Sequence, residues 1–233
     1  MRKVFITGIG SISSLGLTVD EQLVKLRNAQ SGIGKAKHFQ SVYALQLPFA
    51  EIDASDNELK QLTGFSDKGI TRTTLIALKA FQEAIADSNL SKQEISNTRT
   101  AFISSSTVGG MCYTDALYSD ANNKGETSDF FSSYEGSNHT LQIVKKYQLK
   151  GYTDTINTAC SSAANAILLG ARLIQTGRAD RAIVGGADCL AKFTVNGFNS
   201  LRILNEQPCR PFDEHREGLT LGEGAAYLVL EAE

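Results

Sequence analysis

Apolar residues along this chain form two kinds of pattern, short runs and longer stripes. Short apolar runs rich in branched side chains occupy residues 4–9, 101–105, 181–187 and 225–231, and they predict strands buried in a sheet. Residues 153–158 alternate between polar and apolar positions, which predicts one more strand. The chain therefore has strands near both of its ends.

Longer stripes with helical spacing lie between these runs. The sequence Thr-Val-Asp-Glu at residues 18–21 is a capping box, and it predicts an amphipathic helix that continues to Gln30. A second helix is expected over residues 71–88, where the apolar side chains share one stripe, and another over residues 141–147. Residues 161–175 carry Ala, Ile and Leu on nearly every face, which predicts a helix between two layers.

The order of these elements indicates the fold class. The strand, helix and strand within residues 153–187 form a βαβ unit, whose two strands run parallel. Strands at both ends of an alternating pattern predict an α/β domain with a mostly parallel sheet. Residues 119–138 are rich in Ser, Asn, Asp and Gly, so we expect a polar insertion there. A length of 233 residues suits one such domain.

Composition and charge narrow the classes of function. Apolar residues make up 42% and charged residues 21%, which is ordinary for a globular protein. A net charge of −2 without a basic stripe argues against nucleic-acid binding. The longest unbroken apolar run, residues 225–230, is too short to cross a membrane. The four cysteines form no Cys-x-x-Cys pair, which disfavours a zinc site and leads us to expect a reducing, cytoplasmic location.

The segment most informative about chemistry surrounds Cys160, between a predicted strand and a predicted helix. A helix N-terminus carries roughly half a positive charge and free backbone N–H groups, which stabilise a thiolate. The same N–H groups can receive the oxyanion of a thioester under attack. The small neighbours Ala159, Ser161 and Ser162 leave room for a substrate carbonyl. Cys160 is thus a candidate nucleophile, with a buried structural cysteine as the alternative.

A second candidate is the sequence Thr-Gly-Ile-Gly at residues 7–10, which resembles the start of a dinucleotide-binding fingerprint. Ser13 stands where the third glycine is required, and the acidic residue expected on a following strand has no such strand. A tight turn is the favoured interpretation, and a nicotinamide oxidoreductase is a distant alternative.

The histidines and the remaining cysteines lack the spacing that chemistry requires. No histidine is spaced with another ligand as a metal site needs, so all three are expected on the surface, although a role beside the polar insertion stays open for His139. The other cysteines lack a helix-start setting and are expected to be packing residues. These residues are His38, His139, His215, Cys112, Cys189 and Cys209.

Around Cys160 the sequence resembles the β-ketoacyl-[acyl-carrier-protein] synthase family of the thiolase-like superfamily. The resemblance extends in the family's order from residue 4 to residue 231 and strengthens the assignment of Cys160 as the nucleophile. The matching segments are residues 4–10 with 15–16, 31–33, 107–110, 158–162, 185–188, 210–213, 216–218 and 222–225.

The resemblance implies a five-layer αβαβα fold made of two similar halves. Residues 1–233 look like the N-terminal domain, the first of these halves, with the C-terminal half absent. In the family, two histidines, a lysine and a phenylalanine backbone N–H come from the second half. No residues of this chain correspond to them, so we expect residues 1–233 alone to be inactive.

The resemblance also implies an activity and a set of residues. An acyl group would move from acyl-carrier protein onto Cys160, and decarboxylative Claisen condensation with a malonyl carrier would follow, without a cofactor. Val108 and Phe198 resemble positions that line the acyl pocket, with ordinary core positions as the alternative. Arg202 and, more weakly, Lys68 resemble positions that contact the carrier protein, with solvated charges as the alternative.

Family members form dimers through the strand that leads to the cysteine, which here runs from Asp154 to Asn157, so a homodimer is expected. An apolar face should also be present for packing on the second half.

Two alternative functions stay open. One is a non-catalytic partner subunit that sets chain length, although such relatives usually lack the cysteine. The other is a thiolase-type acyltransferase that uses coenzyme A thioesters.

Overall fold

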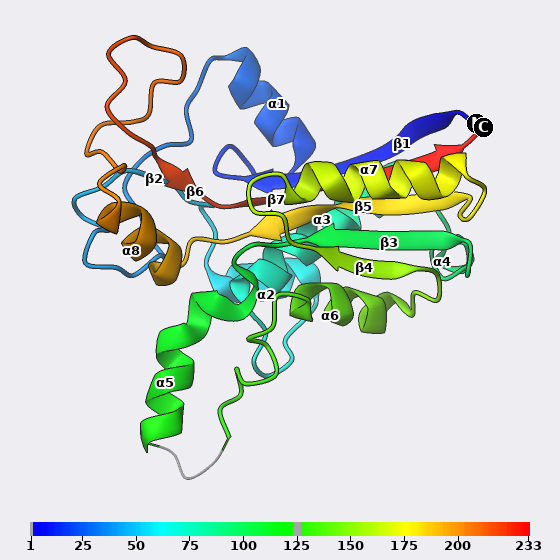
Figure 1. Ribbon diagram of the computed structural model, residues 1–233, viewed down its shortest axis with the longest axis horizontal. Coiled ribbons are helices and arrows are strands. Elements are labelled where there is room, and N and C mark those ends of the chain that lie inside the picture. Colours follow the sequence, from blue (N-terminus) through cyan, green and yellow to red (C-terminus); the bar gives the residue numbers. More distant parts are fainter. Residues whose placement is uncertain (1, 124–126) are drawn as a thin grey trace.

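The computed structural model describes residues 2–123 and 127–233. Five strands form its central sheet: β1 (Val4–Ser13), β3 (Thr100–Ser105), β4 (Thr153–Ile156), β5 (Arg181–Asp188) and β7 (Gly224–Ala232). Their order across the sheet is β1-β7-β5-β3-β4 (Figure 1). β7 pairs antiparallel with both neighbours, and the other four strands share one direction. The expected α/β class with a mostly parallel sheet is confirmed.

The remaining elements surround this sheet. The helices are α1 (Val19–Arg27), α2 (Asp56–Thr63), α3 (Arg72–Ser88), α4 (Lys92–Ile95), α5 (Thr114–Asn123), α6 (Asn138–Tyr147), α7 (Ser162–Gln175) and α8 (Lys192–Ser200), with a 3₁₀ turn, η1, at Gly109–Tyr113. A small parallel pair joins β2 (Phe49–Ala50) to β6 (Leu221–Gly222). No helix in the part of the chain that the structure describes could span a membrane.

The sheet separates two apolar cores, because successive strand side chains point to opposite faces. Phe102 and Ile183 pack on the face covered by α3, together with Phe81 of that helix. Their sequence neighbours Ile103 and Val184 pack on the other face, against α7. The layers helix, sheet and helix follow from this alternation.

Helix α3 forms where the apolar stripe predicts it, over nearly the same residues. Thr71 caps its first turn by accepting a hydrogen bond from the Thr74 backbone N–H, and Asn89 ends it in a left-handed conformation. Strand β1 lies directly on this helix. A Cβ at Gly10 would come within 2.1 Å of the Ala80 carbonyl oxygen, and one at Gly8 within 2.5 Å of the Ala84 oxygen. These glycines lie inside a strand, so the tight-turn interpretation is wrong: they permit close strand–helix packing.

Two elements expected to be buried on all sides are partly exposed. In the edge strand β1, the consecutive residues Phe5 and Ile6 are 47% and 58% exposed. Helix α7 packs on the sheet through residues such as Gly170, whose Cα faces the Val184 side chain. On the other side of α7, Ile167 and Leu168 are 37% and 46% exposed. No second layer covers α7 in the described residues.

The other expected helices differ in detail. Thr18 caps α1 by accepting a hydrogen bond from Glu21 N, but the Glu21 carboxylate accepts from Leu17 N rather than Thr18 N, and the helix ends at Arg27. The expected insertion over residues 119–138 contains the end of α5 and the start of α6, and residues 124–126 lie outside the described residues. Within the insertion, the ring of Phe130 stacks on Tyr113 with 4.5 Å between centroids.

Candidate active site

Cys160 lies in the connection between β4 and α7, as the sequence predicts. The strand ends at Ile156, Ser161 is the N-cap residue and the helix begins at Ser162. Cys160 therefore precedes the N-cap by one residue, and its free thiol is exposed. The positive end of the dipole of the fourteen-residue helix α7 lies at this turn and therefore stabilises negative charge there.

Hydrogen bonds within the turn hold Cys160 in place. Ser162 Oγ accepts from Thr158 N at 2.8 Å and donates to Ala159 O at 2.6 Å. Asn165 Nδ2 donates to Thr158 Oγ1 at 2.8 Å, which ties the connection to the first turn of α7. Ala159 has a φ of 51°, in the left-handed region that non-glycine residues rarely adopt. Ala159, the strained residue directly before Cys160, is thus held in place by the hydrogen bonds that Ser162 and Asn165 make to the turn.

The backbone N–H of Cys160 is available to a ligand. Among the hydrogen bonds between described residues, none uses this N–H, whereas Ser161 N and Ser162 N donate to Thr158 O and Ala159 O. A backbone N–H on the residue that carries the thiol can donate a hydrogen bond to the oxygen of an attacked carbonyl, where negative charge develops. The turn can therefore supply a nucleophile and one oxyanion donor.

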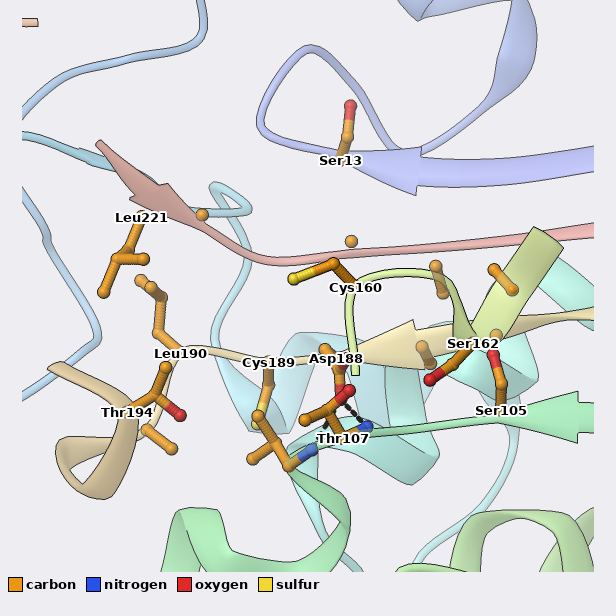
Figure 2. Close-up of a pocket in the computed structure, with 18 of the residues that line it drawn as sticks. Ser13, Ser105, Thr107, Cys160, Ser162, Asp188, Cys189, Leu190, Thr194 and Leu221 are labelled. Atoms are coloured by element: carbon orange, nitrogen blue, oxygen red, sulfur yellow. Dashed lines mark hydrogen bonds between the residues drawn. The ribbon is translucent and has the colours of Figure 1, made fainter. Parts of the chain in front are cut away.

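The Cys160 thiol opens on an apolar cavity of about 670 Å³. Figure 2 shows its sulfur directed toward the side on which Leu190 and Leu221 lie, with Asp188 and Thr107 across the cavity. A cavity of this kind fits an aliphatic chain better than a charged group. Its large apolar lining residues are Ile12, Val108, Leu190, Val195, Phe198 and Leu221.

The structure brings together three of the five candidate site residues. Cys160, Val108 and Phe198 line the same cavity, whereas Arg202 and Lys68 do not. Arg202 is exposed beyond the end of α8 with a φ of 55°, and Lys68 is exposed in the loop between α2 and α3. Both cations are accessible to solvent.

The structure corrects the prediction that all three histidines lie on the surface. His38 and His215 are exposed, but His139 is 2% exposed. Burial lowers the pKa of His139 to about 4, although a hydrogen bond from the ring to the Gly136 carbonyl opposes this shift. His139 Nε2 bonds Ser104 Oγ at 2.7 Å, and this hydroxyl also bonds Tyr227 at 2.5 Å. None of the three histidines lines the cavity beside Cys160.

The other cysteines have partners within the protein. Cys189 is buried in the cavity wall, with its sulfur 3.1 Å from Thr73 Oγ1. The interaction between the two thiols lowers the pKa of Cys112 and raises that of Cys189, whose burial adds to the rise. The part-buried Cys209 donates its backbone N–H to Thr220. Residues 2–123 and 127–233 contain no group of three or more side chains that could hold a metal ion.

Asp188 is a cavity residue that sequence reasoning did not single out. It ends β5, and one of its carboxylate oxygens accepts three hydrogen bonds from residues 106–108. Two features of the sequence point to it. Asp188 belongs to the matching segment 185–188, and its carboxylate directly follows a predicted strand, where loops commonly form sites in α/β folds.

Comparisons with known proteins agree with this geometry. The family model "Beta-ketoacyl synthase, N-terminal domain" matches residues 1–233. A 3-oxoacyl-[acyl-carrier-protein] synthase 2 from Coxiella burnetii is 31% identical over 99% of this chain and 58% of that protein. Nodulation protein E from Rhizobium meliloti is 29% identical, with the same coverage. The chain thus spans little more than half the length of these relatives.

A solved structure extends the likeness to the fold. The ishigamide ketosynthase/chain length factor superimposes with a TM-score of 0.90 over 99% of this chain and 58% of that chain, at 25% identity. Such agreement over 99% of the chain extends the α/β class to a thiolase-like ketosynthase fold.

Proposed function

The chain belongs to the β-ketoacyl synthase family, whose N-terminal domain matches all of it, and from this premise we propose that the protein is a condensing enzyme of fatty-acid or polyketide synthesis. It takes an acyl group from acyl-carrier protein onto Cys160. The observation that carries this proposal is the exposed thiol at the N-terminus of α7, beside a free backbone N–H and an apolar cavity of about 670 Å³.

The first step is transfer of the acyl group. The Cys160 thiolate attacks the carbonyl carbon of the carrier thioester, and the Cys160 N–H binds the oxyanion. The bond from this carbon to the carrier sulfur then breaks, and the carrier leaves as a thiol after taking up a proton. The acyl chain lies in the cavity between Val108 and Phe198. Covalent capture replaces one difficult reaction by two easier ones.

The second step forms the carbon–carbon bond. A malonyl carrier loses CO₂, and the resulting enolate attacks the thioester on Cys160, which departs as a thiolate and leaves a β-ketoacyl carrier. His38, His139 and His215 all belong to the described residues, and none of them lines the cavity. We therefore propose that the groups stabilising the enolate come from outside residues 1–233, and that these residues alone do not carry out condensation. The exposed apolar side chains of α7, Ile167 and Leu168, are suited to packing against that additional half.

The proposed partners follow from the same reasoning. Acyl-carrier proteins are acidic, and the exposed cations Arg202 and Lys68 are candidates for contact with such a protein. A homodimer would form through β4, the edge strand that precedes Cys160. This strand ends at Ile156, so Asn157 of the expected contact lies in the turn. All four cysteines are free thiols, which supports a cytoplasmic location.

The presence of Cys160 supports an acyl-transferring enzyme over a non-catalytic chain-length subunit. A direct test incubates the protein with acyl-carrier thioester and, separately, with acyl-coenzyme A, and measures intact mass. We expect an acyl adduct from the carrier thioester that is absent in the Cys160→Ala variant. An equal yield from coenzyme A would favour the thiolase alternative. A stable complex with carrier protein but no adduct would favour the non-catalytic subunit.

A further inference from the structure

A single carboxylate oxygen organises one wall of the cavity. Asp188 Oδ1 accepts hydrogen bonds from Ser106 Oγ at 2.7 Å, Thr107 N at 2.9 Å and Val108 N at 2.8 Å. All three donors belong to the turn that follows β3, whereas Asp188 ends the neighbouring strand β5. Figure 2 shows Asp188 and Thr107 facing each other across this junction. Three donors on one charged oxygen form a strong and directional set.

The same turn has further connections that limit its conformations. Ser106 Oγ, while donating to Asp188, accepts from Gly109 N at 2.8 Å. Gly109 has a φ of +54°, and a Cβ there would come within 2.6 Å of Gly136 Cα, so the backbone is fixed by close packing. Thr107 Oγ1 donates to Ala159 O at 3.4 Å. The turn held by Asp188 therefore contacts the residue that precedes Cys160.

The position of this turn determines the position of an apolar side chain. Val108, whose N–H donates to Asp188, is 7% exposed and lines the cavity together with Cys160. Asp188 is the only carboxylate among the described residues that line this cavity. Without it, the N–H groups of Thr107 and Val108 would lose their acceptor, and the turn would shift toward water or another partner.

We propose that Asp188 is a positioning residue that fixes the wall formed by Thr107 and Val108 and thereby sets which acyl chain lengths Cys160 accepts. This inference rests on the proposed function, since it concerns the acyl group bound at Cys160. Asp188 acts through Val108 rather than on the thioester. Its carboxylate need not be charged for this role; it must accept hydrogen bonds from the turn.

The test uses the intact protein and a mixture of short, medium and long acyl-carrier thioesters in competition. Intact mass reports the share of each chain length on Cys160. In Asp188→Ala we expect the ratio between the preferred and the longest chain to change by about tenfold, because a displaced wall changes the hydrophobic fit. Asp188→Asn should retain more of the wild-type profile than Asp188→Ala, because its amide oxygen still accepts hydrogen bonds from the turn.

A double-mutant cycle separates positioning from general loss of structure. Val108→Ala should also shift the profile, and Asp188→Ala in that background should add little, because both changes act on one wall. Ser106→Ala removes one of the three donors and should give a smaller shift in the same direction. This variant replaces Asp188→Ala in the test if Asp188→Ala does not fold. An unchanged profile in the folded variants, or fully additive shifts, would overturn the inference. A wild-type protein that is never acylated would overturn both the inference and the proposed function.

Discussion

The guanidinium of Arg72 and the carboxylate of Glu223 form an ion pair inside the protein, with 2.6 Å between Nη2 and Oε1. The Glu223 side chain has no exposed surface. Burial alone would lower the pKa of Arg72, but hydrogen bonding and the charge of Glu223 outweigh burial and raise it. Glu223 also accepts from Ile52 N and from Leu190 N, a residue of the cavity wall. The pair thus joins the start of α3 to the segments around the cavity.

The first prediction concerns this ion pair. Glu223→Ala leaves the Arg72 charge without its buried partner, and we expect the free energy of unfolding to fall by about 3–5 kcal/mol. Ile52 N and Leu190 N donate to different oxygens of Glu223, so Glu223→Gln keeps an acceptor for one of them and should cost less than Glu223→Ala. Urea denaturation of both variants measures the difference. Equal losses would contradict the account, because the charge and the hydrogen bonds would then not contribute separately.

The second prediction concerns the pH dependence of stability at His139. The Gly136 oxygen can only accept, so Nδ1 carries the ring proton and Nε2 accepts from Ser104. The folded protein holds this histidine neutral down to a pKa of about 4, against 6.5 for a free histidine. The unfolded chain therefore binds a proton first. The stability is complete above pH 6.5, declines as the pH falls from 6.5 to 4, and the loss reaches about 3 kcal/mol.

Urea midpoints measured between pH 7 and pH 4 test this second prediction, with His139→Gln as the comparison. We expect the variant to be less stable at neutral pH but to lose the part of the pH dependence that lies between 6.5 and 4. Tyr227, in the same network, stays neutral over this range because burial raises its pKa. An identical pH profile in wild type and variant would refute the assignment to His139.

The third prediction compares two glycines. Gly10→Ala places a methyl group against the Ala80 carbonyl oxygen and should destabilise the protein by about 1–3 kcal/mol. Gly197→Ala lies in α8, where the new methyl group meets nothing within 4 Å, and should stabilise it by about 0.5–1 kcal/mol. Thermal unfolding of both variants provides the measurement. Effects of the same sign would show that close packing of β1 on α3 is not what requires Gly10.

The fourth prediction concerns the reactivity of the thiols. Iodoacetamide should alkylate the exposed Cys160 about tenfold faster or more than Cys112 and Cys189, which must first become accessible through local opening. Peptide mapping over time gives the individual rates. In the folded protein Cys112 should react before Cys189, because Cys189 is more deeply buried and the pKa is lowered for Cys112 and raised for Cys189. Similar rates for all four cysteines in the folded state would contradict this order.

The region around Cys160 could be predicted from the sequence because its determinants are local. The strand before it, the small residues of the turn and the apolar helix after it are consecutive in the chain, and the structure has them as β4, the turn and α7. Helix α2 was not predicted, although a local signal for it is present. Its capping box of Ser55 and Glu58 stands in the sequence, although the apolar pattern around it is too short to attract notice.

The remaining features depend on residues far away in the sequence. The close packing that requires Gly10 comes from Ala80 on α3, and the environment that buries His139 comes from Ser104 and Tyr227. Apolar side chains on all faces of an element do not show which of those faces another element covers. For this reason β1 and α7 were expected to be buried on all sides. The role of Asp188 likewise depends on a turn eighty residues before it.

The central claim is that Cys160 accepts the acyl group, and mapping the adduct tests it most directly. The protein is treated with an acyl-carrier thioester, digested at a pH that preserves thioesters, and its cysteine peptides are analysed by mass spectrometry. The account predicts that the acyl group is found on the peptide that contains Cys160 and is lost on treatment with hydroxylamine. An adduct located on Cys112, Cys189 or Cys209 instead, or the absence of any adduct, would contradict it.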